Sequence, residues 1–91
     1  MKPGWCAYLL MCADGTLYAG STNDLERRVH EHNDSVKGAK YTRVRRPVSL
    51  AYSIPCKDRS EAGKQEASLK ALTRSQKLAL IAGNRVLSST T

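Results

Sequence analysis

The stretch WCAYLLMCADGTLYAG, residues 5–20, determines the fold because it has the pattern of a β-hairpin. Its first half is an apolar run with the length of a buried strand. Asp14-Gly15 is a strong turn signal, and a returning strand follows it. A two-residue turn would place Tyr8 and Tyr18 on opposite faces, whereas a three-residue loop over 13–15 with a glycine bulge pairs 10 with 18 and 8 with 20. We expect the bulged loop, which puts both tyrosines on one face.

The rest of the chain predicts helices and one further strand. Asn23-Asp24 offers an N-cap, and Asp58 to Glu61 has the pattern of a capping box. The expected elements are a helix over 25–33, a basic loop over 34–46, a strand over 48–54, a helix over 60–72, and a short helix over 76–82 that ends at Gly83-Asn84. This order, β-β-α-β-α-α, predicts an α+β fold in which three helices flank a small three-stranded antiparallel sheet. We expect one domain over residues 1–84 and a polar, disordered tail over 85–91.

Length and charge narrow the class of protein. The chain has 91 residues, which suits one domain, and 15 Lys and Arg against 8 Asp and Glu give a net charge of +7. The excess favours a polyanionic partner, because neutralised phosphates release counterions. A small basic protein without such a partner would have the same composition. No stretch has the length of a membrane span or the pattern of a secretory signal, so we expect a cytoplasmic protein without membrane association.

The three cysteines, Cys6, Cys12 and Cys56, are an odd number and predict no disulfide framework. Cys6 and Cys12 lie among apolar residues and are expected to be small buried hydrophobes. A zinc site with His30 and His32 as further ligands is the alternative. The lack of a Cys-x-x-Cys pair argues against it.

The first predicted helix carries charged residues on the face that should be buried. Leu25, Arg28, Val29 and His32 have the i, i+3, i+4, i+7 spacing of one face. In the next helix, Glu66 lies within the apolar stripe. Burying an unpaired charge is costly, so Arg28 and Glu66 either pair across the two helices or line a shared pocket. A guanidinium, an imidazole and a carboxylate in one pocket suit phosphoryl chemistry.

Four segments together resemble the GIY-YIG nuclease superfamily. They are Cys6-Ala7-Tyr8, Tyr18-Ala19-Gly20, residues 23–32 (NDLERRVHEH) and residues 60–70 (SEAGKQEASLK), the last of which is similar to the metal-binding helix of that family. Cys-Ala-Tyr and Tyr-Ala-Gly stand where the family has Gly-Ile-Tyr and Tyr-Ile-Gly, and in both the tyrosine is kept. The similarity extends from Gly4 to Ala82 and is greatest to small stand-alone bacterial members of uncharacterised role.

The resemblance implies a divalent-metal-dependent endonuclease that hydrolyses phosphodiester bonds in DNA, with branched or damaged structures and DNA repair as possible contexts. It implies that Glu66 holds one Mg²⁺ or Mn²⁺ ion and that Arg28 neutralises charge on the phosphate. Tyr18, aided by Tyr8, would activate or position the attacking water, and His32 would serve as an acid–base relay. Tyr18, His32 and metal-bound water stay open as alternatives for the general base.

The alternative function is a non-catalytic DNA- or RNA-binding module on the same fold. The basic segment after the first helix would supply its contacts, and Tyr41 is a candidate for stacking on a base. The candidate nucleic-acid-binding residues are Arg27, Lys37, Lys40, Tyr41, Arg43, Arg45 and Arg46. A third interpretation is a small basic protein with core tyrosines and an internal Arg28–Glu66 pair. We also expect a protein partner for targeting, because 91 residues leave no room for a separate targeting domain.

Overall fold

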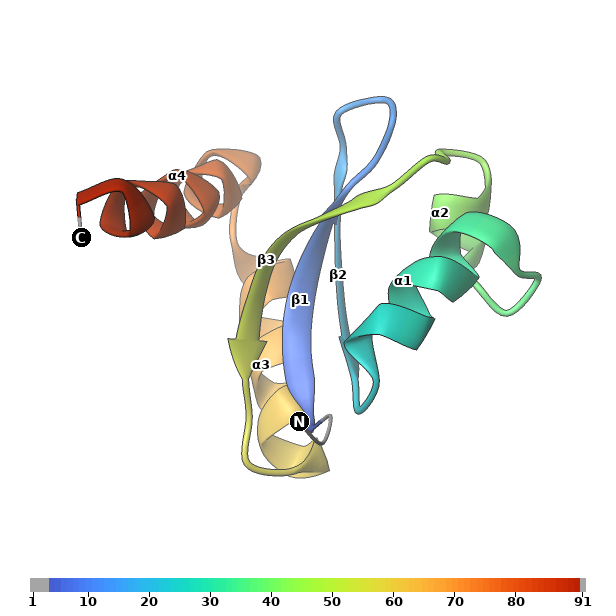
Figure 1. The fold of residues 1–91 in the computed structure, drawn as a ribbon, viewed down its shortest axis with the longest axis horizontal. Helices are drawn as coiled ribbons and strands as arrows, with labels where there is room; N and C mark the ends of the chain where they lie inside the picture. Colours follow the sequence, from blue (N-terminus) through green and yellow to red (C-terminus); the bar gives the residue numbers. More distant parts are fainter. Residues whose placement is uncertain (1–3, 91) are drawn as a thin grey trace.

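The chain forms a three-stranded antiparallel sheet with helices on both faces. The computed structural model describes the backbone of residues 4–90 and the side chains of residues 4–83. In chain order the elements are β1 (Cys6–Met11), β2 (Leu17–Thr22), α1 (Leu25–Asp34), α2 (Lys40–Arg43), β3 (Ser49–Pro55), α3 (Arg59–Ala71) and α4 (Arg74–Thr90). The strand order in the sheet is β2-β1-β3 (Figure 1). The predicted α+β fold with its three-stranded sheet is confirmed.

The β1–β2 hairpin has the predicted bulged loop. Leu10 pairs with Tyr18, and Tyr8 pairs with Gly20. The two tyrosines therefore lie diagonally on one face of the sheet. Gly15 in the loop has φ of 84°, a conformation that side chains disfavour, which explains why glycine occupies this position.

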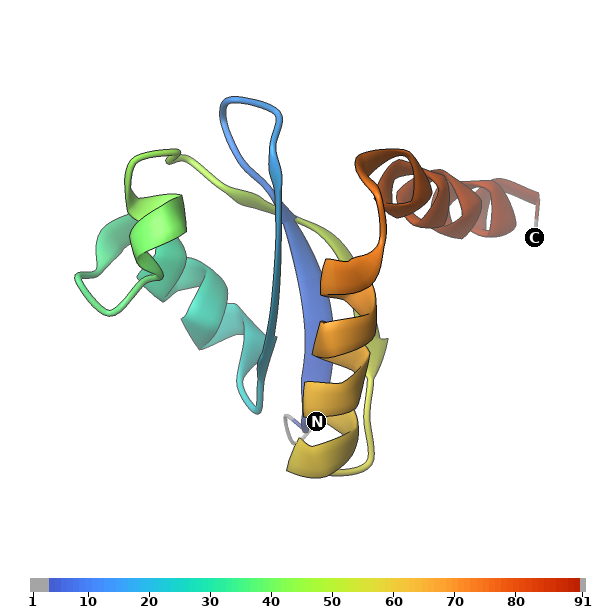
Figure 2. The same cartoon turned by 180° about the vertical axis from the view of Figure 1, so that it is seen from behind.

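Alternation along β1 divides the core into two layers, because successive strand residues point to opposite faces. Leu9 faces α3 and belongs to a cluster with Leu69. Tyr8 belongs to the cluster on the other face, against which Leu25 and Val29 of α1 pack. Figures 1 and 2 show α3 on one side of the sheet and α1 with α2 on the other. Since β2 is an outer strand, groups from α1 and α3 can approach one another around its edge.

Side-chain hydrogen bonds cap the first turns of α1 and α3. Asp24 accepts a hydrogen bond from a backbone N–H in the first turn of α1. At the start of α3, Asp58 accepts from the Glu61 N–H at 2.8 Å, and the Glu61 carboxylate accepts from the Lys57 N–H at 2.9 Å. Both carboxylates of the predicted capping box therefore cap the helix start, although Glu61 accepts from Lys57 and not from the N-cap residue Asp58. Both also suit the positive end of the helix dipole.

The last helix is longer than predicted. α4 continues through Gly83 to Thr90 instead of ending at Gly83-Asn84, because one interior glycine costs a helix only about 1 kcal/mol. The predicted domain over 1–84 and disordered tail over 85–91 stay predictions, since the side chains after Gly83 lie outside the described residues. In the described part of the chain, no helix is both long and apolar enough to cross a membrane.

The segment over 34–46, predicted as a loop, contains the four-residue helix α2. Gly38 lets this segment lie against α1, because a Cβ there would come within 2.6 Å of the Glu31 carbonyl oxygen. Thr42 of α2 is fully buried. Such a short helix has no periodic pattern in the sequence and forms only through tertiary contacts, so the loop prediction is wrong here.

Gly20 makes room for Tyr8 on the neighbouring strand. A Cβ at this position would lie 2.6 Å from Tyr8 Cζ, and Tyr8 is only 1% exposed. We expect Gly20→Ala to lower the free energy of unfolding by about 1–3 kcal/mol. Gly63→Ala is the control, because a Cβ there meets nothing within 4 Å in a helix interior and should stabilise α3. Urea denaturation measures both changes, and a Gly20→Ala protein as stable as wild type would contradict this packing.

Candidate active site

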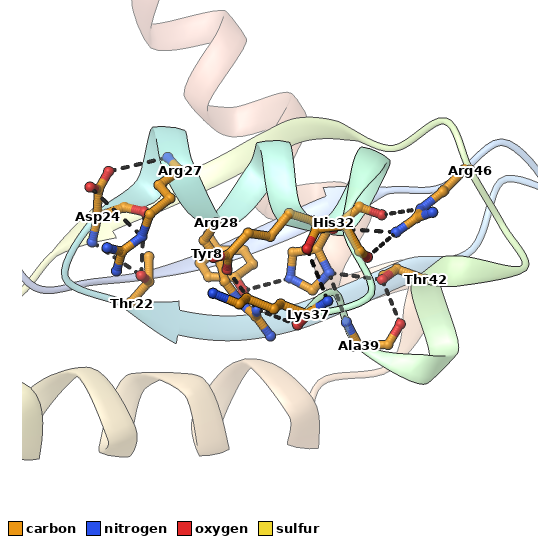
Figure 3. A network of polar contacts seen from close by, with 12 residues as sticks. Tyr8, Thr22, Asp24, Arg27, Arg28, His32, Lys37, Ala39, Thr42 and Arg46 are labelled. Carbon is orange, nitrogen blue, oxygen red and sulfur yellow. Dashed lines mark hydrogen bonds and ion pairs between the residues drawn. The ribbon is translucent and has the colours of Figure 1, made fainter.

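Four of the predicted site residues lie together on the α1 side of the sheet. Tyr8 Oη is 3.0 Å from His32 Nε2. The ring of Tyr18 lies edge-on to His32, with centroids 5.3 Å apart. Arg28 lies one turn before His32 on α1 and approaches the same Tyr8 phenol (Figure 3). The helix spacing and the bulged hairpin together produce this cluster.

Arg28 is held by α1 and the segment that follows it. Its Nη1 donates to Glu31 Oε1 at 3.0 Å and to the Lys37 carbonyl oxygen at 2.8 Å. The alternative in which Arg28 and Glu66 form an ion pair is therefore not realised, because α1 and α3 cover opposite faces of the sheet and Glu66 pairs with Lys70. Both bonds use Nη1 of a guanidinium with five N–H donors, which leaves donor capacity for a phosphate.

His32 is a neutral base at physiological pH. The residue is fully buried, and its Nδ1 lies 2.8 Å from Thr42 Oγ1. Burial, reinforced by the positive charge of Arg28, lowers the pKa of His32 to about 4. The imidazole is therefore uncharged near pH 7, and one of its two ring nitrogens can accept a proton.

Tyr8 presents its phenol to this neutral base. Burial raises the pKa of Tyr8 to about 12, although the nearby Arg28 acts in the opposite direction. The phenol therefore keeps its proton at neutral pH. Its hydrogen bond to His32 suits a group that passes a proton on rather than one that ionises by itself.

Glu66 approaches the same strand edge from the opposite face. Its Oε1 accepts a hydrogen bond from Ser21 Oγ at 2.6 Å, and its Oε2 lies 2.8 Å from Lys70 Nζ. Burial acts to raise the pKa of Glu66, but the hydrogen bonds from Lys70 and Ser21 outweigh it and hold the pKa below its usual value. The charge of Glu66 is the smallest of the contributions that raise the pKa of Tyr8. Glu66 contacts the sheet through Ser21 of β2.

The Glu66 carboxylate fits a cation site that a bound phosphate completes. Mg²⁺ keeps several waters and is commonly held by one or two carboxylates together with substrate phosphates. Glu66 is ionised at neutral pH, and its side chain is 24% exposed. One accessible carboxylate beside β2 is therefore a suitable protein ligand set for such an ion.

A zinc site of the kind considered for the cysteines and histidines is not formed. All three cysteines are free, and Cys6 and Cys12 are buried as predicted. Among the side chains of residues 4–83, no three or more His, Cys, Asp or Glu are placed to hold a metal ion together. His30 instead lies 3.3 Å from Asp34 on the outer face of α1.

Tyr41 is 38% exposed, but its ring is already in contact with two neighbouring side chains. Its ring stacks on Tyr18 with centroids 5.7 Å apart, and Arg45 Cζ lies 3.9 Å from the centre of the Tyr41 ring. Arg45 also lies 3.1 Å from Asp14 Oδ2. Tyr41 therefore supports the position of Tyr18, and base stacking on it would require a neighbour to move.

Arg46 binds the end of α1. Its Nε donates to the His32 carbonyl oxygen at 2.6 Å, and its Nη2 donates to the carbonyl oxygens of Glu31 and Ser35. The carbonyls of Glu31 and Ser35 also accept backbone N–H bonds from Ser35 and Gly38, so the cationic guanidinium adds a second donor to them at the negative end of the helix. Of the predicted nucleic-acid-binding residues, Arg45 and Arg46 thus hold the site together, while the exposed ones are Arg27, Lys37, Lys40, Tyr41 and Arg43.

Three polar residues of the site were not identified from the sequence. Thr42 contacts His32, and Ser21 and Lys70 contact Glu66. The i, i+4 spacing of Glu66 and Lys70 is a signal that could have indicated their ion pair. No sequence signal distinguishes Ser21 or Thr42 from other polar residues, because their contacts exist only in the folded chain.

The buried, neutral His32 predicts a loss of stability in mild acid. Its pKa of about 4 in the folded protein lies below the value of about 6.5 expected in the unfolded chain. The contribution of His32 is complete above pH 6.5 and is lost as the pH falls toward about 4, because the unfolded chain then takes up the proton first. This should lower the free energy of unfolding by about 2–3 kcal/mol between about pH 7.5 and pH 4.5.

Urea unfolding at both pH values isolates the His32 contribution when two variants are compared. His32→Asn should show a smaller pH dependence than wild type, whereas His30→Gln, which removes the exposed histidine, should keep it. Equal pH dependence in the two variants would show that His32 is not the group responsible.

Sequence comparison relates the chain to one family along most of its length. The GIY-YIG catalytic domain matches residues 4–79. The UPF0213 protein DP2720 of Desulfotalea psychrophila is 52% identical over 80 residues, which cover 88% of this chain and 73% of that protein. A UPF0213 protein of Bacillus pumilus is 56% identical over 70 residues, which cover 77% of this chain and 70% of that protein.

Solved structures support the same relationship. The solution NMR structure of the protein EF2693 from E. faecalis has a TM-score of 0.57 at 41% identity and covers 92% of this chain and 88% of its own. The solution NMR structure of the UPF0213 protein BH0048 from Bacillus halodurans has a TM-score of 0.54 at 40% identity, with coverages of 86% and 82%. The predicted resemblance is confirmed, and the chain belongs to the GIY-YIG family, among the small bacterial UPF0213 proteins.

Proposed function

We propose that this protein is a divalent-metal-dependent endonuclease that hydrolyses phosphodiester bonds, in DNA rather than RNA and with branched or damaged DNA among its substrates. The observation that carries the proposal is the arrangement at the β2 edge. There, Arg28 and the neutral Tyr8–His32 pair lie on one face of the sheet, and the ionised carboxylate of Glu66 bonds to Ser21 of β2 from the other. The match to a catalytic domain whose superfamily consists of nucleases supports it.

Glu66 would hold the metal ion, Mg²⁺ or Mn²⁺, together with oxygens of the bound phosphate. When bound there, the ion would act as a Lewis acid on the scissile phosphate. Lys70 Nζ lies 2.8 Å from Glu66 Oε2. It would have to move away from this oxygen for the ion to bind there. Ser21, bonded to the other oxygen, would keep the carboxylate oriented.

Arg28 would donate hydrogen bonds to the phosphate and stabilise the charge that develops on it. Tyr18, more exposed than Tyr8, would position the attacking water. As the water oxygen bonds to phosphorus, its proton would pass to Tyr8 Oη while Tyr8 gives its own proton to His32 Nε2. The phosphorus–oxygen ester bond breaks on the opposite side, and the leaving oxygen takes a proton from solvent.

The exposed basic residues on α1 and the segment after it would bind the sugar–phosphate backbone. This α1–α2 basic surface consists of Arg27, Lys37, Lys40 and Arg43. Replacing the last three together with alanine should lower the slope of log K against log salt by about 0.9 for each lost contact with duplex DNA. Lys57→Ala with Lys64→Ala at the start of α3 is the control. Equal salt slopes for wild type and the triple variant, measured by fluorescence anisotropy, would contradict the placement.

Cleavage of a panel of labelled nucleic acids tests the proposed function. The panel contains single-stranded, duplex and branched DNA and matching RNAs, each incubated with Mg²⁺, with Mn²⁺ and with EDTA. We expect cutting of at least one DNA with metal and none with EDTA. Salt-sensitive binding without cutting in any sample would overturn the enzyme and leave a nucleic-acid-binding module on a nuclease fold.

A further inference from the structure

Thr42 lies on the side of His32 away from Tyr8, as Figure 3 shows. Its Oγ1 is 2.8 Å from His32 Nδ1 and donates to the Ala39 carbonyl oxygen at 2.9 Å. Both Thr42 and His32 are fully buried. Each ring nitrogen of His32 therefore has a protein partner, Tyr8 at Nε2 and Thr42 at Nδ1, and solvent does not compete for either.

The single hydroxyl proton of Thr42 determines the direction of these bonds. Because that proton is donated to Ala39, Oγ1 has only lone pairs to offer, and Nδ1 must be the donor to it. Nε2 then presents a lone pair toward Tyr8 Oη, 3.0 Å away, so the phenol donates to the imidazole. The Ala39 N–H points at Nδ1 and would favour a lone pair on it, but this contact is 3.4 Å long. The Thr42 contact at 2.8 Å is much shorter and therefore decides the tautomer.

The backbone around Thr42 is fixed against α1 from two directions. Before α2, Gly38 packs on the backbone of Glu31 and His32 so closely that no Cβ fits. After α2, Arg46 bonds to the His32 carbonyl oxygen. These contacts hold Thr42 at a fixed distance from the imidazole. The four-residue helix α2 is the element that places Thr42 there.

We propose that Thr42 is a positioning residue that keeps His32 in its Nδ1–H tautomer, so that Nε2 is always ready to accept the Tyr8 proton. Without the Thr42 oxygen the two tautomers compete, and the Nε2–H form cannot accept from Tyr8. Hydrogen bonds to the second ring nitrogen orient histidine in this way in many sites. The consequence for cleavage rests on the proposed function, whereas the tautomer is a property of the resting protein.

Ring ¹⁵N NMR of histidine-labelled full-length protein near pH 7 tests the assignment directly, since the two neutral tautomers differ strongly in their nitrogen shifts. We expect one Nδ1–H pattern for His32 in wild type and in Thr42→Ser. Thr42→Val should show mixed or Nε2–H shifts, and Thr42→Ala repeats the test if the valine variant does not fold. Thr22→Val is the control, because it removes a buried hydroxyl that bonds to Asp24 instead of His32 and should leave the tautomer unchanged.

Single-turnover cleavage provides the functional readout on the best substrate of the panel. Thr42→Val should lower the rate by about 10- to 100-fold, the range found for groups that orient a ligating histidine, with Thr42→Ser close to wild type and DNA affinity unchanged. An unchanged Nδ1–H pattern in both Thr42→Val and Thr42→Ala overturns the proposal. If the wild type cuts no substrate, the proposed function fails, and the NMR result still decides whether Thr42 sets the tautomer.

Discussion

Glu66→Gln is expected to lower the single-turnover rate of DNA cleavage by about 10³-fold while leaving DNA affinity within a few-fold of wild type. The loss corresponds to roughly 4 kcal/mol, a typical size for the charge stabilisation that a bound metal ion supplies. The amide keeps the shape of the side chain and can still accept the hydrogen bond that Ser21 donates at 2.6 Å. It removes the negative charge that a divalent ion needs.

The control for this substitution is Glu26→Gln, which removes the same charge from an exposed position on α1. It should cut at the wild-type rate. Isothermal titration of Mn²⁺ provides a readout besides cleavage, and Glu66→Gln should abolish the heat of binding seen with the protein–DNA complex. A Glu66→Gln protein that cuts as fast as wild type would show that Glu66 does not take part in cleavage.

Arg28→Ala should lower the cleavage rate by about 10²- to 10³-fold, the cost of losing one preorganised donor to a developing oxyanion. Arg28→Lys should recover only part of the rate, because an ammonium carries the charge without the planar fork of donors. Arg28 also bonds to Glu31 and to the Lys37 carbonyl oxygen, so thermal unfolding must be measured on both variants.

Arg27→Ala is the matched control for Arg28, since the neighbouring arginine is 63% exposed and lies 4.0 Å from Asp24. It should weaken DNA binding slightly and leave the saturated rate unchanged. Equal rate losses in Arg27→Ala and Arg28→Ala would mean that general electrostatic attraction, and not transition-state stabilisation, explains the effect of Arg28.

The hairpin could be predicted from the sequence because its signals are local. Asp14-Gly15 sets the loop, and the bulged register that follows from a glycine in the left-handed conformation places Tyr8 and Tyr18 on one face. The helix starts are local as well, since Asp24 and Asp58 cap the first turns within three residues. These features depend on neighbours in the chain, which the sequence displays directly.

The partners of the charged residues could not be predicted in the same way. Helical periodicity correctly places Arg28 and Glu66 on the inner faces of their helices. It does not tell which side of the sheet each helix covers, and the alternative of a direct ion pair fails because the two helices lie on opposite sides. Arg28 pairs instead with Glu31 within its own helix, and Glu66 pairs with Lys70 within its own.

The role of the basic segment after α1 could not be predicted from the sequence either. Its composition indicates phosphate binding. In the structure, however, Arg46 donates to the His32 carbonyl oxygen near the end of α1, and Arg45 lies over the ring of Tyr41. Thr42 lies in the same segment and contacts the buried imidazole. A residue's charge shows that it can bind phosphate, whereas only the packing of the segment against α1 shows which side chains are already engaged.

The central claim is that residues from the two faces of the sheet form one metal-dependent centre around the edge of β2. Single-turnover cutting of the best DNA substrate by wild type, Glu66→Gln, Arg28→Ala and the double variant tests it most directly. We predict that each single variant loses nearly all activity and that the double variant loses little more, because groups that act as a unit are not additive. Single variants that cut at the wild-type rate would contradict the claim. The activity would then come from another nuclease in the preparation.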